Sequence, residues 1–159
     1  MISVVIPTLD AEDSLVACLS PLIPASMAGL VRELIVVDAG STDATLEIAD
    51  DAGARIVRSN DGVGAGIAIA RGPWVLALDP VVRLERGWEV AVQSHIEMSR
   101  EAARFRLYRA QARGLARLVP PRAMAALFLV EAGHRRGGGL DANALRRLGG
   151  RRLDVRGAV

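Results

Sequence analysis

Lysine is absent from this chain, and all 20 of its basic residues are arginines. Without lysine, the protein has no amine for a Schiff base and no Walker lysine for a phosphate-binding loop. Codon bias in a GC-rich genome explains an arginine-only chain most simply. Because 18 acidic residues offset the arginines, the formal net charge is only +2.

Cysteine and aromatic residues are also scarce. Cys18 is the only cysteine, which excludes an intrachain disulfide and a thiolate metal site. Aromatic residues make up 3% of the chain, which argues against a nucleic-acid-binding surface built on base stacking. Hydrophobic residues nevertheless make up 51% of the chain, so its core must consist mainly of Leu, Val, Ile and Ala.

Sequence signals of secretion and membrane insertion are missing as well. The chain opens on apolar residues without a basic leader, and no apolar run reaches the ~18 residues of a membrane span. A length of 159 residues fits one domain of ordinary size. We therefore expect a cytoplasmic protein with a single domain over residues 1–159.

Apolar runs predict the strands, and the segments between them predict the helices. Strands are expected at residues 2–6, 34–37, 55–58, 74–78, 104–108, 125–130 and 152–155. The first helix is expected to be capped by Asp10 or Asp13, to stop before two prolines, and to share one face among Leu15, Val16 and Leu19. Later helices are expected at 44–52, 87–100 and 111–118, the second of these with one face formed by Val90, Ala91, Ser94 and Met98. Residues 62–66 are expected to form a flexible glycine loop.

This alternation of strands and helices predicts an α/β protein with a doubly wound, mostly parallel sheet and helices on both faces. Ligands of such folds bind beyond the carboxyl ends of the strands. Polar side chains follow three of the predicted strands at that edge, and a carboxylate at the end of a buried strand is costly unless it is used. They are Thr8 and Asp10 after the first strand, Asp38 after the second and Asp79 after the fourth.

Three segments resemble the family-2 glycosyltransferases of GT-A fold. They are ISVVIPT at residues 2–8, IVVDAGSTDAT at 35–45 and ARGPWVLALD at 70–79. The resemblance implies a GT-A-like sheet with a nucleotide-binding half at residues 1–100 and a reduced acceptor-side half at 101–159. It also implies that the protein binds a nucleotide-sugar donor and transfers the sugar to an acceptor.

The resemblance further implies roles for individual residues. Thr8 and Asp10 line the base pocket, and Asp38 accepts hydrogen bonds from the base or the ribose, because a carboxylate is an acceptor only. Gly64 lies in a loop whose backbone can approach a phosphate, since glycine has no Cβ; a plain surface loop is the alternative. Residues 41–43 are expected to cap the helix that follows them.

The family's metal-binding Asp-x-Asp motif is degenerate here, because the corresponding residues read Asp79-Pro80-Val81. We expect Asp79 to hold Mg²⁺ or Mn²⁺ only with help from the donor diphosphate and water. Asp141 resembles the family's catalytic base, and a helix cap is its alternative role. Both histidines, His95 and His134, are expected at the surface.

Two other functions stay open at this stage. One is a non-catalytic descendant that acts as a nucleotide-binding, regulatory or interaction protein, with a homodimer forming through the apolar residues 123–130. The other, a nucleotidyltransferase, normally needs a basic glycine-rich loop after the first strand, and residues 8–13 contain neither glycine nor arginine. The arginines of 100–122 fit either a solvated face or an anionic acceptor, such as a lipid phosphate at a membrane surface.

Overall fold

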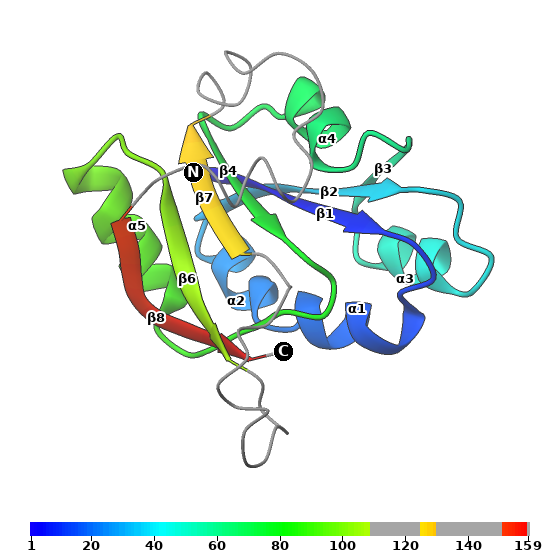
Figure 1. Ribbon diagram of the computed structural model, residues 1–159, viewed down its shortest axis with the longest axis horizontal. Helices are drawn as coiled ribbons and strands as arrows, with labels where there is room; N and C mark the ends of the chain where they lie inside the picture. Colours follow the sequence, from blue (N-terminus) through cyan, green and yellow to red (C-terminus); the bar gives the residue numbers. More distant parts are fainter. Residues whose placement is uncertain (109–124, 130–150, 159) are drawn as a thin grey trace.

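The computed structural model describes residues 1–108, 125–129 and 151–158. Within them, an eight-stranded sheet has the order β3-β2-β1-β4-β7-β6-β8-β5 (Figure 1). Its strands are β1 (Ile2–Thr8), β2 (Val31–Asp38), β3 (Arg55–Arg58), β4 (Trp74–Leu78), β5 (Arg83–Leu84), β6 (Ala103–Tyr108), β7 (Ala125–Leu129) and β8 (Arg151–Ala158). The described helices are α1 (Glu12–Leu19), α2 (Leu22–Met27), α3 (Thr45–Asp51), α4 (Val63–Ile69) and α5 (Trp88–Met98).

The first four strands form the parallel block that the sequence predicts. β1 pairs in parallel with both β2 and β4, and β2 pairs in parallel with β3. The arrowheads of β1 and β2 therefore point to the same side of the molecule in Figure 1. β7 joins this block antiparallel to β4, and β6 and β8 pair with each other in parallel. The prediction of a mostly parallel, doubly wound sheet is confirmed.

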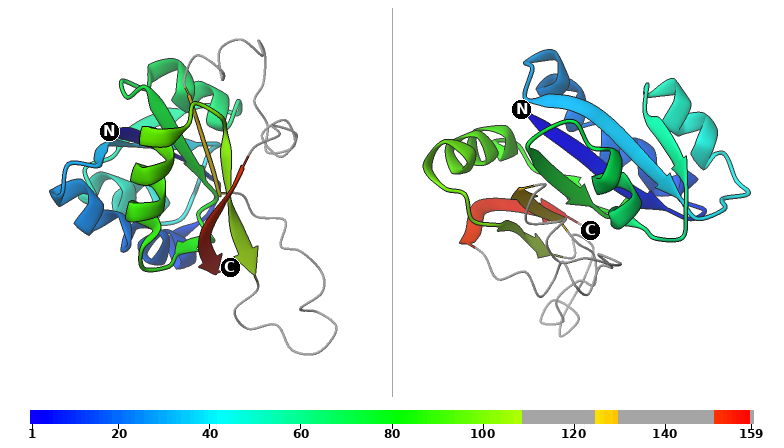
Figure 2. Two further views of the ribbon diagram at one scale, coloured as in Figure 1. Left: turned by 90° about the vertical axis from the view of Figure 1, so that its left-hand side faces the viewer. Right: turned by 90° about the horizontal axis from the view of Figure 1, so that it is seen from above.

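Each strand of the block sends alternate side chains to opposite faces of the sheet. Ile2, Val4 and Ile6 belong to a core that also contains buried residues of α1, α2, α3 and α5. Val5 instead packs with α4 on the other face. The views in Figure 2 show α5 along the side of the sheet formed by β6 and β8.

A glycine explains how closely α4 approaches the sheet. Residues 62–66 are not the flexible loop that their glycines suggested, because all but Gly62 lie inside α4. A Cβ on Gly66 would lie 2.3 Å from Cγ1 of Val5 on β1. The glycine is therefore needed for helix–strand packing and not for backbone freedom.

Two helix faces and a connection differ from the expectations. Pro21 is the N-cap of α2 and Pro24 lies within it, so these prolines begin a helix as well as ending one. Val16 is 57% exposed, although Leu15 and Leu19 are buried as expected. α5 buries Trp88, Val92 and His95, whereas the predicted face has Val90 and Met98 exposed.

His95 is a core residue and not a surface one. His95 is 5% exposed, and its ring meets that of Trp74 edge-on at a centroid distance of 5.8 Å. Its Nε2 atom lies 2.7 Å from the carbonyl oxygen of Glu101. His95 thus joins α5 to the segment that leads into β6, which is a structural role.

The stretch expected to form a dimer interface lies in the middle of the sheet. β7 is flanked by β4 and β6, and Ala125, Ala126, Leu127 and Phe128 are buried. Residues 125–128 are therefore not available to a second copy, which contradicts their part in the predicted interface; the homodimer itself stays a prediction. Among the residues that the structure describes, no helix is long and apolar enough to cross a membrane.

Candidate functional site

The order of the parallel strands reverses between β1 and β4, since β2 and β3 lie on one side of β1 and β4 lies on the other. Ligands of doubly wound sheets bind in the crevice that such a reversal opens at the carboxyl ends of the strands. Thr8 ends β1 at this point, and Asp79 directly follows β4. Asp38 ends β2 in register with Thr8. The fold therefore brings these three predicted site residues to one edge.

Asp38 is the most enclosed of the three. Asp38 is 1% exposed, and its neighbour Thr8 is 4% exposed. The Thr8 hydroxyl donates to one carboxylate oxygen of Asp38 at 3.2 Å. The backbone N–H groups of Gly40 and Ser41 each donate to the other oxygen at 3.0 Å, and the Ser41 hydroxyl donates to the first. The donors surrounding Asp38 hold its carboxylate in one orientation.

These donors also keep Asp38 ionised. Burial alone raises the pKa of a carboxyl, but the hydrogen bonds from Ser41, Gly40 and Thr8 together outweigh burial and lower the pKa of Asp38 below its ordinary value of 3.8. A carboxylate with such partners is a fixed negative charge and a hydrogen-bond acceptor. It suits a ligand group that carries an N–H or O–H.

Asp10 links the loop after β1 to the loop after β2. Its backbone lies in the left-handed region with φ of 45°, a conformation that aspartate tolerates better than most residues. Its N–H donates to the Ser41 hydroxyl oxygen at 3.0 Å, and its carboxylate accepts the N–H of Thr42 at 2.8 Å. The predicted contact with a ligand therefore stays a prediction, whereas the link between the two loops is present.

Beyond this link, helices α1 and α3 cap each other. The N–H of Glu12 donates to the Asp43 carboxylate at 3.0 Å, and the Glu12 carboxylate accepts the N–H of Ala44 at 2.8 Å. Ala11 and Ala44, the actual N-cap residues, have no side chain that can cap. The predicted caps Asp10 and Asp13 do not cap α1. One N–H at the start of α1 is instead satisfied by Asp43 from the loop before α3, and the N–H of the α3 N-cap residue is satisfied by Glu12 from α1.

The expected capping of α3 by residues 41–43 is only partly right. Asp43 accepts the N–H of Thr45 at 3.0 Å and so serves the first turn of α3. Ser41 and Thr42 turn toward Asp38 and Asp10. Sequence reasoning missed the contacts of Ser41 and Thr42 with Asp10, because they require knowing that the loops after β1 and β2 are neighbours.

Gly64 lies in the first turn of α4, where its N–H donates to the carbonyl oxygen of Asp61 at 3.2 Å. The loop geometry that motivated its predicted phosphate contact is therefore absent. The structure does not test whether Gly64 contacts a phosphate, so this role stays a prediction.

Asp79 begins a turn that contacts α1. Its carbonyl oxygen accepts the N–H of Val82 at 3.0 Å and faces the Cys18 thiol at 3.7 Å. Burial and the nearby charge of Asp79 raise the pKa of Cys18 to about 12, so this thiol is inert. In the described part of the chain, no three potential metal-binding side chains come together. The metal-binding role expected of Asp79 stays a prediction.

Two predicted residues of the second half cannot be placed. Asp141, the expected base, and His134 both lie outside the described residues. The same holds for the predicted helix at 111–118.

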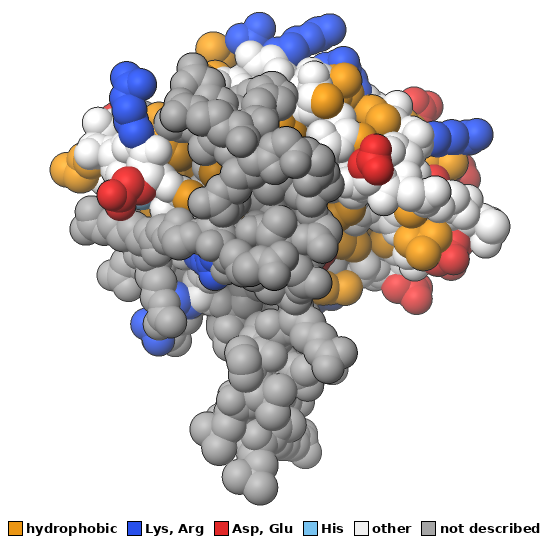
Figure 3. All heavy atoms as spheres, turned by 45° about the horizontal axis from the view of Figure 1, so that its top comes forward, with side chains coloured by type: hydrophobic (Ala, Val, Ile, Leu, Met, Phe, Trp, Pro, Cys, Tyr) orange, Lys and Arg blue, Asp and Glu red, His pale blue; other side chains and the backbone are white. Residues whose placement is uncertain are grey.

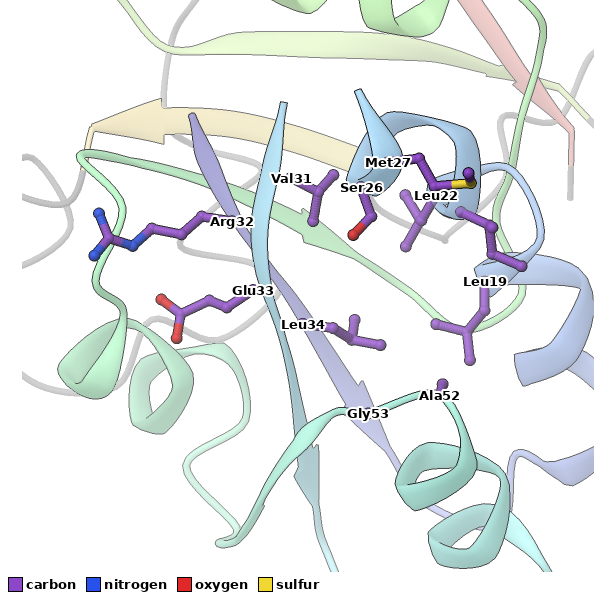
Figure 4. A pocket seen from close by; sticks show the side chains of 11 residues that line it. Leu19, Leu22, Ser26, Met27, Val31, Arg32, Glu33, Leu34, Ala52 and Gly53 are labelled. Carbon is purple, nitrogen blue, oxygen red and sulfur yellow. The ribbon is translucent and has the colours of Figure 1, made fainter. Parts of the chain in front are cut away.

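A separate apolar groove lies at the other end of β2. It has a volume of about 380 Å³ and is lined mainly by α2, β2 and the end of α3. Figure 4 shows Leu19, Leu22, Val31 and Leu34 facing it, while the side chains of Arg32 and Glu33 point to the opposite side of β2. The groove therefore lies at the amino end of the strand, away from the edge that holds Asp38.

Acidic side chains are spread over the side of the molecule that carries α3 and β3, at the right of Figure 3. Exposed Glu47, Asp50 and Asp51 of α3 contribute to this charge, as does Asp61 after β3. Anionic ligands are not expected to bind over that helix.

Comparisons with known proteins agree with this fold. Residues 3–80 match the model of Glycosyl transferase family 2. A glucosyl-3-phosphoglycerate synthase of Mycolicibacterium paratuberculosis is 54% identical over 59 residues, which are 35% of this chain and 17% of that protein. A PGL/p-HBAD biosynthesis glycosyltransferase of Mycobacterium tuberculosis is 35% identical over 89 residues, 49% of this chain and 34% of that protein. The chain thus matches only 17% to 34% of the length of these curated relatives.

Solved structures give the same architecture. Staphylococcus aureus TarS 1-349 in complex with UDP superimposes with a TM-score of 0.69 at 15% identity, over 99% of this chain and 60% of that one. The glucosyl-3-phosphoglycerate synthase of M. tuberculosis, in complex with Mn²⁺, UDP and glucosyl-3-phosphoglycerate, gives 0.57 at 23% identity, over 82% and 57%. At these identities the likeness shows the GT-A fold alone.

Proposed function

We propose that this chain is a family-2 glycosyltransferase that binds a nucleotide-sugar donor and transfers the sugar to an acceptor. The match of residues 3–80 to the glycosyl transferase family 2 model and the GT-A fold support this proposal. The observation that carries this proposal is the pairing of Thr8 and Asp38 where the strand order reverses. That is the part of a doubly wound sheet where ligands bind.

The nucleoside is proposed to bind at the carboxyl ends of β1 and β2. Asp38 offers an ionised acceptor to a base N–H or a ribose hydroxyl, with Thr8 and Asp10 beside it. Because several protein donors already bond to Asp38, a ligand donor must displace or share one of them. UDP is the first nucleotide to test, since the TarS and glucosyl-3-phosphoglycerate synthase structures contain it.

The diphosphate is proposed to lie toward the end of β4, where Asp79 would help to hold Mg²⁺ or Mn²⁺. Mg²⁺ in phosphate-binding sites is often held by one or two carboxylates together with substrate phosphates and water. One carboxylate therefore fits a cation that arrives with its nucleotide. Such a cation would neutralise the negative charge that develops on the diphosphate when it leaves the sugar.

Sugar transfer requires a base that accepts the proton of the acceptor hydroxyl. Asp141 is the proposed base. The acceptor is proposed to be anionic, because arginines recur at residues 100–122 and attract negative charge. One related synthase structure contains phosphoglyceric acid, and an acceptor of that class or a lipid phosphate at a membrane surface fits the same charge.

A nucleotide-binding protein without transferase activity is the second candidate. Pro80 and Val81 stand where the family's metal motif continues, and Val81 supplies no ligand. The described residues hold no cluster of three metal-binding side chains. This candidate predicts nucleotide binding that does not depend on a divalent cation.

Calorimetric titration with UDP-, GDP- and dTDP-sugars, with and without Mn²⁺, tests both candidates. The wild type is expected to bind one of these donors, and Asp38→Asn is expected to weaken binding about tenfold or more, because a charged acceptor is lost. Asp51→Asn, an exposed aspartate on α3, is the matched control and should bind as the wild type does. Absence of binding to every donor contradicts both candidates. Binding without a Mn²⁺ effect and without sugar release supports the second.

A further inference from the structure

Ser41 connects three groups at the proposed nucleoside site. Its hydroxyl donates to one oxygen of the Asp38 carboxylate and accepts the N–H of Asp10 at 3.0 Å. Its own N–H donates to the other oxygen of Asp38 at 3.0 Å. One serine therefore contacts both oxygens of Asp38 and also fixes the loop after β1.

The segment that holds Ser41 is itself fixed. The N–H and the hydroxyl of Thr42, the next residue, both donate to the Asp10 carboxylate, at 2.8 Å and 3.3 Å. Asp10 thus forms hydrogen bonds with residues 41 and 42, and Asp38 forms hydrogen bonds with Ser41. A hydroxyl held at both ends has little freedom to rotate, so it orients the carboxylate that it bonds to.

We propose that Ser41 is a positioning residue that orients the Asp38 carboxylate and thereby determines which nucleotide base the protein accepts. The inference rests on the proposed nucleotide binding. Asp38 is an acceptor only, so it favours a base whose edge presents an N–H. Uracil presents this N–H at ring atom N3, whereas cytosine has none at N3 and presents its N–H groups on the exocyclic N4. A carboxylate that is held in one orientation facing N3 therefore prefers UDP to CDP, whereas a carboxylate that is free to turn can accept from either base.

Other contacts of Asp38 do not replace this role. The Thr8 hydroxyl comes from a rigid strand and contacts one oxygen only, at the longer distance of 3.2 Å. The Gly40 N–H contacts the other oxygen only. Of the side chains that bond to Asp38 in the described part of the chain, Ser41 is the one that also reaches Asp10.

Ser41→Ala removes the hydroxyl, and we expect the variant to fold. The Asp10 N–H that loses its partner lies at an exposed site, where water can replace the serine. Asp38 keeps its bonds to two backbone N–H groups and to Thr8. We expect the preference for UDP over CDP to fall about tenfold, because the carboxylate can then turn toward the N4 amino group of cytosine.

The experiment measures the dissociation constants of UDP and CDP, with Mn²⁺ present, for four proteins: wild type, Ser41→Ala, Ser41→Thr and Ser14→Ala. Ser41→Thr keeps the hydroxyl and should restore the preference. Ser14 also carries a half-buried hydroxyl, but that group donates to the Ala11 carbonyl at 3.3 Å, so its loss should leave the preference unchanged. Ser41→Cys, a variant of similar size with a weaker donor, should lie between serine and alanine and serves if alanine does not fold.

The outcomes separate this inference from the proposed function. A wild type that binds neither nucleotide overturns both. A wild type that prefers UDP, with the same preference in Ser41→Ala, overturns the role of Ser41 alone. So does a loss of affinity in Ser41→Ala that is equal for UDP and CDP, because a merely structural serine would act on both. A loss of preference that Ser41→Thr repairs supports the inference.

Discussion

Ala11 donates its backbone N–H to the hydroxyl oxygen of Thr45 at 2.8 Å, and both residues are buried. The bond joins the start of α1 to the first residue of α3, across 34 positions of sequence. Together with the paired contacts of Glu12 and Asp43, it makes the loops after β1 and β2 one unit. The proposed nucleoside site is built on that unit.

Thr45→Val is expected to destabilise the protein by about 1–3 kcal/mol, because it leaves the buried N–H of Ala11 without an acceptor and removes the hydroxyl's bond to Asp43, while keeping the side-chain volume. Chemical denaturation measures the change. Thr42→Val is the matched control, since Thr42 is exposed and its hydroxyl bond to Asp10 is long at 3.3 Å. Equal stability losses in the two variants would show that the buried bond between Ala11 and Thr45 contributes no more to stability than the exposed bond of Thr42.

Gly66→Ala is expected to destabilise the protein by about 1–3 kcal/mol, the usual cost of overpacking a core. The new Cβ would lie 2.3 Å from Val5 Cγ1, so α4 or β1 must shift. Thermal denaturation gives the difference. Adding Val5→Ala to Gly66→Ala opens the space and should reduce the penalty of the glycine substitution. A Gly66→Ala protein as stable as the wild type would refute the close packing.

The strands were predictable from sequence because their signal is local. Residues 55–58 and 74–78 form strands as expected, and the first two observed strands contain the predicted runs. Buried parallel strands are continuously apolar, and this pattern needs no knowledge of distant residues. The same holds for the placing of Thr8, Asp38 and Asp79, since each follows directly from a strand end.

What failed depended on contacts between distant segments. The glycines of residues 62–66 predict a loop, because glycine usually marks turns and loops, whereas Gly66 allows α4 to pack closely against Val5. The buried face of α5 was misplaced because spacing alone does not say which side meets the core; Trp88, Val92 and His95 have helical spacing too. The sequence likewise does not indicate that β7 lies between β4 and β6, so it does not indicate that residues 125–128 are buried.

Acidification is expected to lower the free energy of unfolding, in part because protonation of Asp38 breaks its hydrogen bonds. Its pKa is lower in the folded protein than the ordinary value of 3.8, so the bonds contribute stability that is fully present above that value. This stability is lost as the pH falls through the lower, folded pKa. Asp38→Asn should flatten the acid limb of stability, measured by urea denaturation between about pH 7 and about pH 2.5. An unchanged acid limb would contradict the assignment.

The acid limb should not vanish in Asp38→Asn, because two further carboxyls have lowered pKa values. For Glu33, burial raises the pKa, but hydrogen bonds from the Arg71 N–H, Ser3 and Arg55 outweigh it. For Asp43, the hydrogen bond from Thr45 is the main cause. Asp51→Asn serves as the control and should leave the limb as it is in the wild type.

Val81→Asp is expected to strengthen the dependence of UDP affinity on Mn²⁺, because it restores a second carboxylate two residues after Asp79. Val81 is 44% exposed, so the charge does not have to be buried. Titration of UDP with and without Mn²⁺ measures the effect. Val90→Asp, at a position on α5 that is 72% exposed, controls for the added charge.

The companion variant Asp79→Asn should have the opposite effect and reduce the contribution of Mn²⁺ to UDP affinity. If Val81→Asp and Asp79→Asn both leave the Mn²⁺ contribution unchanged, the end of β4 is not the cation site. The fold and the nucleoside site would be unaffected by that result.

The proposed function depends above all on a nucleotide binding where the strand order reverses between β1 and β4. A crystal structure of the chain with UDP and Mn²⁺ decides this point. We expect the uridine beside Thr8 and Asp38, with the diphosphate and the cation at Asp79. UDP bound elsewhere, for example in the apolar groove between α2 and β2, would contradict it.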